Sequence, residues 1–190
     1  YMATDEFKQK RIKKLKENIQ IKKILCSAGY LLFDNEEYFD SHIGDGILLD
    51  YTSSESAFFF SEQQTKFQFI ATTDNRIVIE SINKLLPAEF EYPIPLHLKF
   101  PLKKYYMPNC QKLPMTNIIT NLGCPFKCGF CTWSNLKYRQ RKIPNVIEEL
   151  KFLNKNNIYE IMFIDPTFGA NSNHAVELLN AILKNRINIG

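Results

Sequence analysis

The second half of the chain alternates strand-like and helix-like segments, and this order constrains the fold more than any other feature. Short apolar runs at residues 115–123 and 160–166 have the length and composition of buried strands. Segments with helical periodicity follow them at residues 144–157 and 171–186. Strand–helix–strand–helix order predicts parallel strands joined by right-handed crossovers, and therefore an α/β architecture.

Both predicted helices have apolar positions at helical spacing and a start signal. The apolar positions are Val146, Leu150 and Leu153 in the first helix and Val176, Leu179 and Leu183 in the second. Pro144 suits the first turn of the first helix, and Asn171 or Ser172 is available as the N-cap of the second. In sheets and barrels of this class, chemistry gathers in the loops at the carboxyl ends of the strands.

A proline-rich segment precedes this part of the chain. Six of the nine prolines lie in residues 87–114. Proline fixes φ and removes a hydrogen-bond donor, so the segment is predicted to be neither a regular helix nor a central strand. We interpret it as a linker that lies against protein through its aromatic residues, between an α/β region at residues 1–86 and the start of a barrel at residues 115–190.

The first region is predicted to end an α/β layer. Its expected elements are strands at residues 21–28 and 46–54, a short helix at 55–64, and a hairpin of two strands around Asp74 and Asn75. The segment Lys8–Lys16 is basic, but Ile12, Leu15 and Ile19 recur at helical spacing. We interpret the lysines as the solvated face of an amphipathic helix, because aromatic residues do not alternate with them as nucleic-acid binding would require.

Composition excludes several classes of protein. The chain has 190 residues, of which 45% are hydrophobic, and a formal net charge of +4. It has no apolar run long enough to span a bilayer and no hydrophobic signal-peptide core, so a cytoplasmic protein is expected. Its five cysteines are odd in number and too closely grouped for a disulfide framework.

Three of these cysteines lie in one short loop directly after the strand at residues 115–123. The stretch GCPFKCGFC contains Cys124, Cys128 and Cys131 with the spacing C-x3-C-x2-C. Thiolates are soft ligands that suit zinc or an iron–sulfur cluster. Three ligands in one loop favour a cubane cluster with one iron left open, and Gly129 allows the backbone to approach it closely.

Cys110 leaves an alternative open, because it could complete a four-ligand zinc site or occupy the open iron. The chain would then be a structural or regulatory zinc or iron–sulfur module. Trp133, just beyond the cluster, is a candidate cofactor neighbour or a core residue. Cys26 lies in an apolar strand and is predicted to be an inert buried thiol.

The stretch GCPFKCGFC resembles the signature loop of the radical S-adenosylmethionine (radical SAM) enzymes. The resemblance implies that the three cysteines hold a 4Fe–4S cluster, whose open iron binds S-adenosylmethionine, and that Phe130 and Gly129 lie beside this cofactor. It further implies reductive cleavage of S-adenosylmethionine to a 5′-deoxyadenosyl radical, with an electron donor such as flavodoxin or ferredoxin. The substrate would be a small molecule or a peptide.

Flanking motifs resemble the subclass with a cobalamin-binding domain. These are the proline-rich run, Arg139 and Arg141 before a helix containing Glu-Glu, and the F-x-D-x-x-F pattern that starts at Phe163. Cobalamin is therefore a further candidate cofactor, and methyl transfer a candidate reaction. Where many radical SAM enzymes have Gly-Gly-Glu after the second strand, this chain has Asp165-Pro166-Thr167. Asp165 and Thr167 are candidate cofactor contacts, although an Asp that caps a turn is an equally good interpretation of Asp165.

The resemblance implies the start of a partial (β/α) barrel at residues 115–190. Residues 1–86 resemble the C-terminal part of a Rossmann-like cobalamin-binding domain. We interpret the chain as a fragment that is inactive alone. A methylthiotransferase is an alternative enzyme of the same family, and it would require a second three-cysteine cluster upstream.

Overall fold

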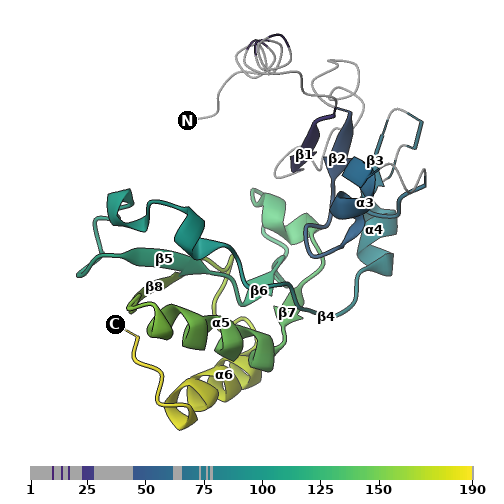
Figure 1. The fold of residues 1–190 in the computed structure, drawn as a ribbon. Helices are drawn as coiled ribbons and strands as arrows, with labels where there is room; N and C mark the ends of the chain where they lie inside the picture. The colour runs from purple at the N-terminus through teal and green to yellow at the C-terminus, as the bar shows by residue number, and fades with distance from the viewer. Residues whose placement is uncertain are drawn as a thin grey trace. The chain divides into compact units, whose positions relative to one another are not determined.

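The computed structural model describes residues 23–27, 45–61, 66–72, 74–75, 77 and 79–189, together with Lys10, Lys14 and Glu17. It divides into two compact units, Tyr1–Leu86 and Pro87–Gly190 (Figure 1). The segment that we interpreted as a linker groups with the second unit. Among the described residues, no helix has the length and apolar character needed to cross a bilayer.

The first unit contains a three-stranded sheet in the order β1-β2-β3. The strands are β1 (Leu25–Ser27), β2 (Gly46–Leu48) and β3 (Ile70–Ala71), of which β1 and β2 are parallel and β3 is antiparallel to β2. Helix α3 (Glu55–Ser61) lies between β2 and β3 in the sequence. These elements confirm the two predicted strands and the short helix.

The predicted hairpin around Asp74 and Asn75 is wrong in its second half. The first run forms β3, but Ile79–Leu85 is helix α4. Ile82 and Leu86 are buried at 2% and 7% exposure, whereas Lys84 and Leu85 between them are exposed. Burial at a spacing of four residues is the period of a helix, so packing of this face overrides the β-branched composition of the segment.

The N-terminal predictions fall largely outside the described residues. Lys10, Lys14 and Glu17 are helical and exposed, as the solvated face of a helix would be. The apolar residues predicted for its opposite face, and the side chain of Cys26, are outside the described part of the chain.

In the second unit, β5 (Met115–Ile118) pairs in parallel with β8 (Glu160–Phe163), with Asn117 opposite Met162. Helix α5 (Ile143–Lys155) connects them, and α6 (Ser172–Lys184) follows β8. Both helices lie on the same side of the strand pair (Figure 1). The predicted strand–helix–strand–helix order and parallel pairing are confirmed.

The helix starts are also as predicted. Pro144 lies in the first turn of α5. Asn171 is the N-cap of α6, and its side-chain oxygen accepts hydrogen bonds from the amides of Asn173 and His174. These contacts satisfy amide groups that have no partner inside the helix.

One hydrophobic core holds the helices against the strands. Its buried members are Ile118, Val146, Ile147, Leu150, Leu153, Ile158, Leu178 and Ile182. The predicted apolar face of α5 is therefore buried. By the area removed from water, a fully buried Leu such as Leu150 contributes about 1.5–3 kcal/mol.

The apolar stripe named for α6 is not the buried one. Val176, Leu179 and Leu183 are 56%, 45% and 74% exposed, whereas Leu178 and Ile182 are buried. This helix is apolar around most of its circumference, so the sequence contains two stripes with the same spacing, and periodicity alone does not distinguish them.

A second sheet carries the cysteine-rich loop. Its order is β4 (Glu89–Phe90), β7 (Arg139–Arg141) and β6 (Asn121–Leu122), with β7 in the centre. The predicted strand at 115–123 is therefore two strands, β5 and β6, that belong to different sheets. The proline-rich segment supplies the edge strand β4 and two short 3-10 helices, η2 (His97–Lys99) and η3 (Leu102–Lys104).

Candidate functional site

The cysteine loop, residues 123–138, projects from a two-stranded stem. Strands β6 and β7 are antiparallel, with Asn121 opposite Gln140 and Leu122 opposite Arg139. The first strand of the stem follows β5 after a two-residue turn at Ile119 and Thr120. The loop therefore lies beyond the carboxyl end of β5, where the sequence predicted that chemistry would gather.

Gly123 fixes the point at which the loop leaves the stem. Its φ is +68°, and a Cβ atom there would lie 2.3 Å from the carbonyl oxygen of Lys137. Only glycine adopts this conformation and leaves this space free. Sequence reasoning quoted Gly123 but did not single it out, although a glycine directly after a strand is a recognised turn signal.

The three cysteines of the loop are free thiols. The amide of Cys131 donates to the carbonyl of Cys128 at 3.1 Å, and the hydroxyl of Ser134 donates to the carbonyl of Cys131 at 2.6 Å. Within the part of the chain that the structure describes, no three His, Cys, Asp or Glu side chains meet as a metal-binding group.

Phe130 and Gly129 lie at the open side of the loop. Phe130 is 93% exposed, and a Cβ atom on Gly129 would meet no atom within 4 Å. Trp133, in the short 3-10 helix η4 (Thr132–Asn135), is 44% exposed and so is not a core residue. Because the Phe130 ring is exposed to solvent almost completely, it is available for contact with a ligand.

Asp165 clamps the turn that precedes the stem. Its carboxylate accepts hydrogen bonds from the Thr120 amide at 2.6 Å, the Thr120 hydroxyl at 2.5 Å and the Asn121 amide at 3.0 Å. Asp165 therefore caps the backbone amides of Thr120 and Asn121. The sequence suggested that it caps its own turn before Pro166, whereas in the structure it caps the turn before β6. A carboxylate offers about four lone-pair positions, so one acceptor position is left.

Thr167 is the residue of the second loop that lies against the first cysteine. Its hydroxyl oxygen is 3.6 Å from the sulfur of Cys124, and its carbonyl accepts from the Asn121 side chain at 3.3 Å. Asn121 thus contacts both Asp165 and Thr167, and Thr167 in turn lies beside Cys124.

Cys110 lies at the other end of the strands. It shares a pocket of about 280 Å³ with Met115 and Glu160, the first residues of β5 and β8. The thiol donates to the Lys112 carbonyl at 2.7 Å. Because the cysteine loop lies beyond the opposite end of β5, this structure does not make Cys110 a fourth ligand of the cysteine loop.

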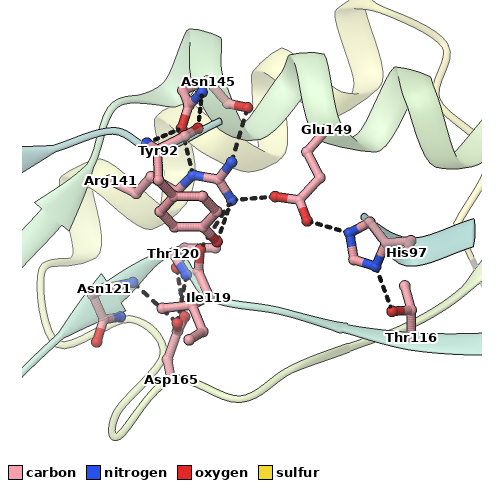
Figure 2. A network of polar contacts seen from close by, with 10 residues as sticks. All are labelled: Tyr92, His97, Thr116, Ile119, Thr120, Asn121, Arg141, Asn145, Glu149 and Asp165. Carbon is pink, nitrogen blue, oxygen red and sulfur yellow. Dashed lines mark hydrogen bonds and ion pairs between the residues drawn. The ribbon is translucent and has the colours of Figure 1, made fainter. Parts of the chain in front are cut away.

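A buried polar network connects the stem strand β7 with η2, β5 and α5 (Figure 2). Arg141 and Glu149 are both 0% exposed and form an ion pair. The other Glu149 oxygen is 2.6 Å from Nε2 of His97, and Nδ1 of His97 is 2.9 Å from the Thr116 hydroxyl. Every charged or polar side chain in this chain of contacts has a buried partner, which is the condition for burying charge without a large cost.

Arg141 has further partners around its guanidinium. Its Nε donates to Asn145 Oδ1 at 2.7 Å, and one terminal nitrogen donates to the Tyr92 hydroxyl at 2.9 Å and to the Ile119 carbonyl at 3.3 Å. The guanidinium carbon also lies 3.9 Å from the centre of the Tyr92 ring. The multiple donors and planar shape of arginine suit such a hub, and lysine does not provide them.

Burial changes the acidity of a tyrosine on each side of the stem. Desolvation, with a further contribution from Glu149, raises the pKa of Tyr92 to about 12. Desolvation also raises the pKa of Tyr138, at the end of the cysteine loop. The shifts favour the protonated phenols above about pH 10, where an ordinary tyrosine begins to ionise.

Sequence reasoning missed this network, although one signal for it was present. Glu149 occurs between Val146, Leu150 and Leu153, at positions i, i+3, i+4 and i+7 of the apolar face of α5. A carboxylate on a buried helix face requires a cationic partner. Arg141 was noted only as part of a flanking motif, and the sequence gives no sign that His97 lies beside Glu149.

The donor set fits an iron–sulfur cluster in its chemistry. Three free thiols on one loop are soft ligands, and the side of the loop at Gly129 and Phe130 is open. In the stem, Asn121 Oδ1 and Gln140 Nε2 are buried side-chain atoms without a hydrogen-bond partner in the structure.

Comparison with known proteins gives partial matches. No protein-family profile matches the chain. The uncharacterized methyltransferase PH0819 of Pyrococcus horikoshii is 36% identical over 92 residues, which cover 46% of this chain and 19% of that protein. The tryptophan 2-C-methyltransferase of Streptomyces laurentii is 30% identical over 73 residues, which cover 37% and 12% respectively. The chain spans less than a fifth of these relatives.

Solved structures match over almost the whole chain. The radical S-adenosylmethionine methyltransferase TsrM from Kitasatospora setae, solved with cobalamin and a [4Fe–4S] cluster, has a TM-score of 0.66 and 14% identity, and covers 95% of this chain and 37% of TsrM. TsrM with tryptophan and a SAM analogue gives 0.64 and 16%. The α/β fold prediction is confirmed, and the relatives found are methyltransferases.

Proposed function

We propose that the chain is part of a radical SAM methyltransferase that holds a 4Fe–4S cluster through Cys124, Cys128 and Cys131. The observation that carries this proposal is the C-x3-C-x2-C loop beyond the carboxyl end of β5, in a fold similar to TsrM. The 36% identity to a methyltransferase supports methyl transfer as the reaction.

Within this proposal, the three thiolates are the cluster ligands, and S-adenosylmethionine is the second cofactor. When bound, the reduced cluster supplies the electron for reductive cleavage of S-adenosylmethionine, and a cobalamin would supply a carrier for the methyl group. A thiolate-bound cluster of this kind requires a reducing compartment such as the cytoplasm, and a reductant such as flavodoxin or ferredoxin.

The residues around the loop have separate tasks in the proposed site. Gly129 lets the backbone approach the cofactor, and Phe130 offers an apolar face to the adenine and excludes water from it. Asp165 accepts from an ammonium group with its remaining lone pair, while Thr167 orients the thiolate of Cys124 by its hydroxyl.

The proposals of a cobalamin cofactor and of a small-molecule substrate rest on the likeness to TsrM. That enzyme was solved with cobalamin and, separately, with tryptophan. Since its likeness covers 95% of this chain, we propose cobalamin as a further cofactor and a small aromatic molecule as the substrate.

The test is anaerobic reconstitution of the full-length protein with iron and sulfide, followed by reduction and EPR with and without S-adenosylmethionine. We expect a reduced 4Fe–4S signal whose shape changes when the cofactor is added. Cys124→Ser, Cys128→Ser and Cys131→Ser should each abolish it, whereas Cys110→Ser, as the matched control, should leave it unchanged.

Two results would contradict the proposal. A colourless protein that holds one zinc ion and loses it in Cys110→Ala would make the loop a structural zinc site. A cluster signal that S-adenosylmethionine does not alter would leave an iron–sulfur protein without the proposed cofactor. Transfer of a labelled methyl group from S-adenosylmethionine, tested first on tryptophan and related small aromatic molecules, then checks the reaction itself.

A further inference from the structure

We infer that the buried chain Arg141–Glu149–His97 is a positioning device for the cysteine loop. It fixes the turn at residues 119–121, from which the loop departs, and through that turn it orients the three thiolates. The inference rests on the proposed function for its consequence in cluster binding, but its structural part can be tested without any cofactor.

The turn is held from two sides. From β7, the Arg141 side chain donates to the Ile119 carbonyl at 3.3 Å, and the Arg141 amide donates to the Thr120 carbonyl at 2.8 Å. From the end of β8, Asp165 accepts from Thr120 and Asn121. Residues 119–121, which lead into the stem, are thereby fixed by a cation on β7 and an anion in the loop after β8 (Figure 2).

Arg141 itself requires support, because a buried guanidinium is stable only when its charge is compensated. Glu149, on α5, provides the opposite charge and is also fully buried. His97, in η2, fixes the other Glu149 oxygen at 2.6 Å and is itself bonded to Thr116 of β5. The network thus runs from the strand before the turn, through the proline-rich segment and the helix, back to the turn.

Further contacts attach the network to the sheet that carries the loop. Tyr92 follows β4 and contacts Arg141 through its hydroxyl and its ring. Asn145 exchanges hydrogen bonds with the Tyr92 backbone, at 3.2 Å and 3.0 Å. His174 of α6 lies 2.9 Å from the Arg141 carbonyl. Such satisfied buried networks specify one arrangement of the groups that they join.

Arg141, Glu149 and His97 are buried, and no contact described for them is with a cysteine of the loop. Arg141, Glu149 and His97 are therefore positioning residues that act through the turn, in the way that outer partners orient metal ligands in known metal sites. Loss of such a partner costs about 10–100-fold in metal affinity in those sites.

The first measurement is hydrogen–deuterium exchange on the cluster-free, full-length protein. We expect Glu149→Gln, which keeps the size of the side chain and removes its charge, and Arg141→Lys to speed exchange of the Thr120 and Asn121 amides. Glu148→Gln is the matched control, since it is the same change one residue earlier, at an exposed position. Unchanged exchange at the turn in both network variants would overturn the inference.

The second measurement separates positioning from general destabilisation. Iron release to a chelator is timed for the reconstituted wild type, Glu149→Gln, Arg141→Lys and Leu153→Ala, which creates a cavity in the core without touching the network. We expect release to be about 10–100-fold faster in the network variants, and to remain near the wild-type rate in Leu153→Ala at equal or greater loss of thermal stability. Equal acceleration in Leu153→Ala would mean that destabilisation alone explains the effect, and would overturn the inference.

Failure of the proposed function gives a different result. If the wild type holds no iron, the cluster proposal fails, and the exchange experiment alone decides whether the network fixes the turn. If the wild type holds a cluster and the network variants release it at the wild-type rate, only the positioning inference fails.

Discussion

The stem and the cysteine loop are neighbours in one hairpin, but they are held in opposite ways. At the stem, Arg139 and Arg141 are 3% and 0% exposed, and ion pairs and hydrogen bonds join them to other elements. In the loop, Phe130 is 93% exposed and Cys128 is exposed. The comparison indicates that contacts within the protein determine the conformation of the stem, whereas the loop leaves Phe130 and Gly129 open. In the proposed function, cluster binding would supply part of the energy that orders the loop.

The largest effect should come from removing the anion behind the stem. Glu149→Ala leaves Arg141 buried without its partner, and breaking a buried pair in this way costs about 3–5 kcal/mol of the free energy of unfolding. Urea denaturation measures this loss. Glu148→Ala, one residue earlier and exposed, should change stability by less than about 0.5 kcal/mol. Similar values for the two variants would mean that the network does not stabilise the stem.

The junction between stem and loop should be the next most sensitive position. Gly123→Ala forces a side chain into a left-handed backbone and against the Lys137 carbonyl, so we expect a loss of about 1–3 kcal/mol. Gly129→Ala, inside the loop, meets no neighbouring atom and should be close to neutral in the absence of ligands. If the two glycine variants were equally stable, Gly123 would not mark the point where the packed stem ends and the exposed loop begins.

The free energy of unfolding should also depend on pH through Tyr92, which contacts Arg141 of the stem. The pKa of Tyr92 is raised to about 12 in the folded protein, so between about pH 10 and 12 the folded state keeps a proton that the unfolded state releases. Stability therefore falls as pH rises through this window, by about 1–2 kcal/mol after allowance for partial exposure. In Tyr92→Phe this component should be absent, which denaturation at pH 9 and pH 11.5 would measure. An unchanged slope would exclude Tyr92 as its source.

The smallest effect on folding should come from the most exposed ring. Phe130→Ala is expected to change the free energy of unfolding by less than about 0.5 kcal/mol, since the ring contacts mainly solvent. If Phe130 covers the cofactor as proposed, the same variant should weaken S-adenosylmethionine binding, followed by titration of the cluster EPR signal. A large loss of stability with unchanged cofactor affinity would mean that Phe130 stabilises the folded protein, as stem residues do, and does not contact the cofactor.

The sequence predicted the elements whose signals are local. Short apolar runs, helical periodicity, Pro144 and Asn171 were sufficient for the parallel pair β5–β8 and its helices. The two apolar stripes of α6 were not distinguishable, because only packing decides which is buried. In the same way, the run Ile77–Ile79 is β-branched, and yet its last residue begins the helix Ile79–Leu85 in the folded unit.

In the candidate site, the proposed ligands come from a local sequence pattern, whereas the residues that support the loop do not. Cysteine spacing identifies Cys124, Cys128 and Cys131 without any structure. Glu149 was detectable as a charge on an apolar helix face, but its partner His97 is 52 residues away in the sequence. No local pattern encodes such a pair. The role of Asp165 as a clamp on Thr120 depends likewise on strands that only the fold brings together.

The edge strand β4 has a consequence for how the protein can be divided into working parts. A shortened protein that starts at Met115, where the barrel-like pattern begins, would keep every cysteine of the loop and both members of the ion pair. It would lose β4, Tyr92 and His97, and so the outer supports of that ion pair. A cut between Leu86 and Pro87 would keep all of them. A piece that begins at Pro87, whose carbonyl accepts a hydrogen bond from Arg139, therefore retains these supports of the loop.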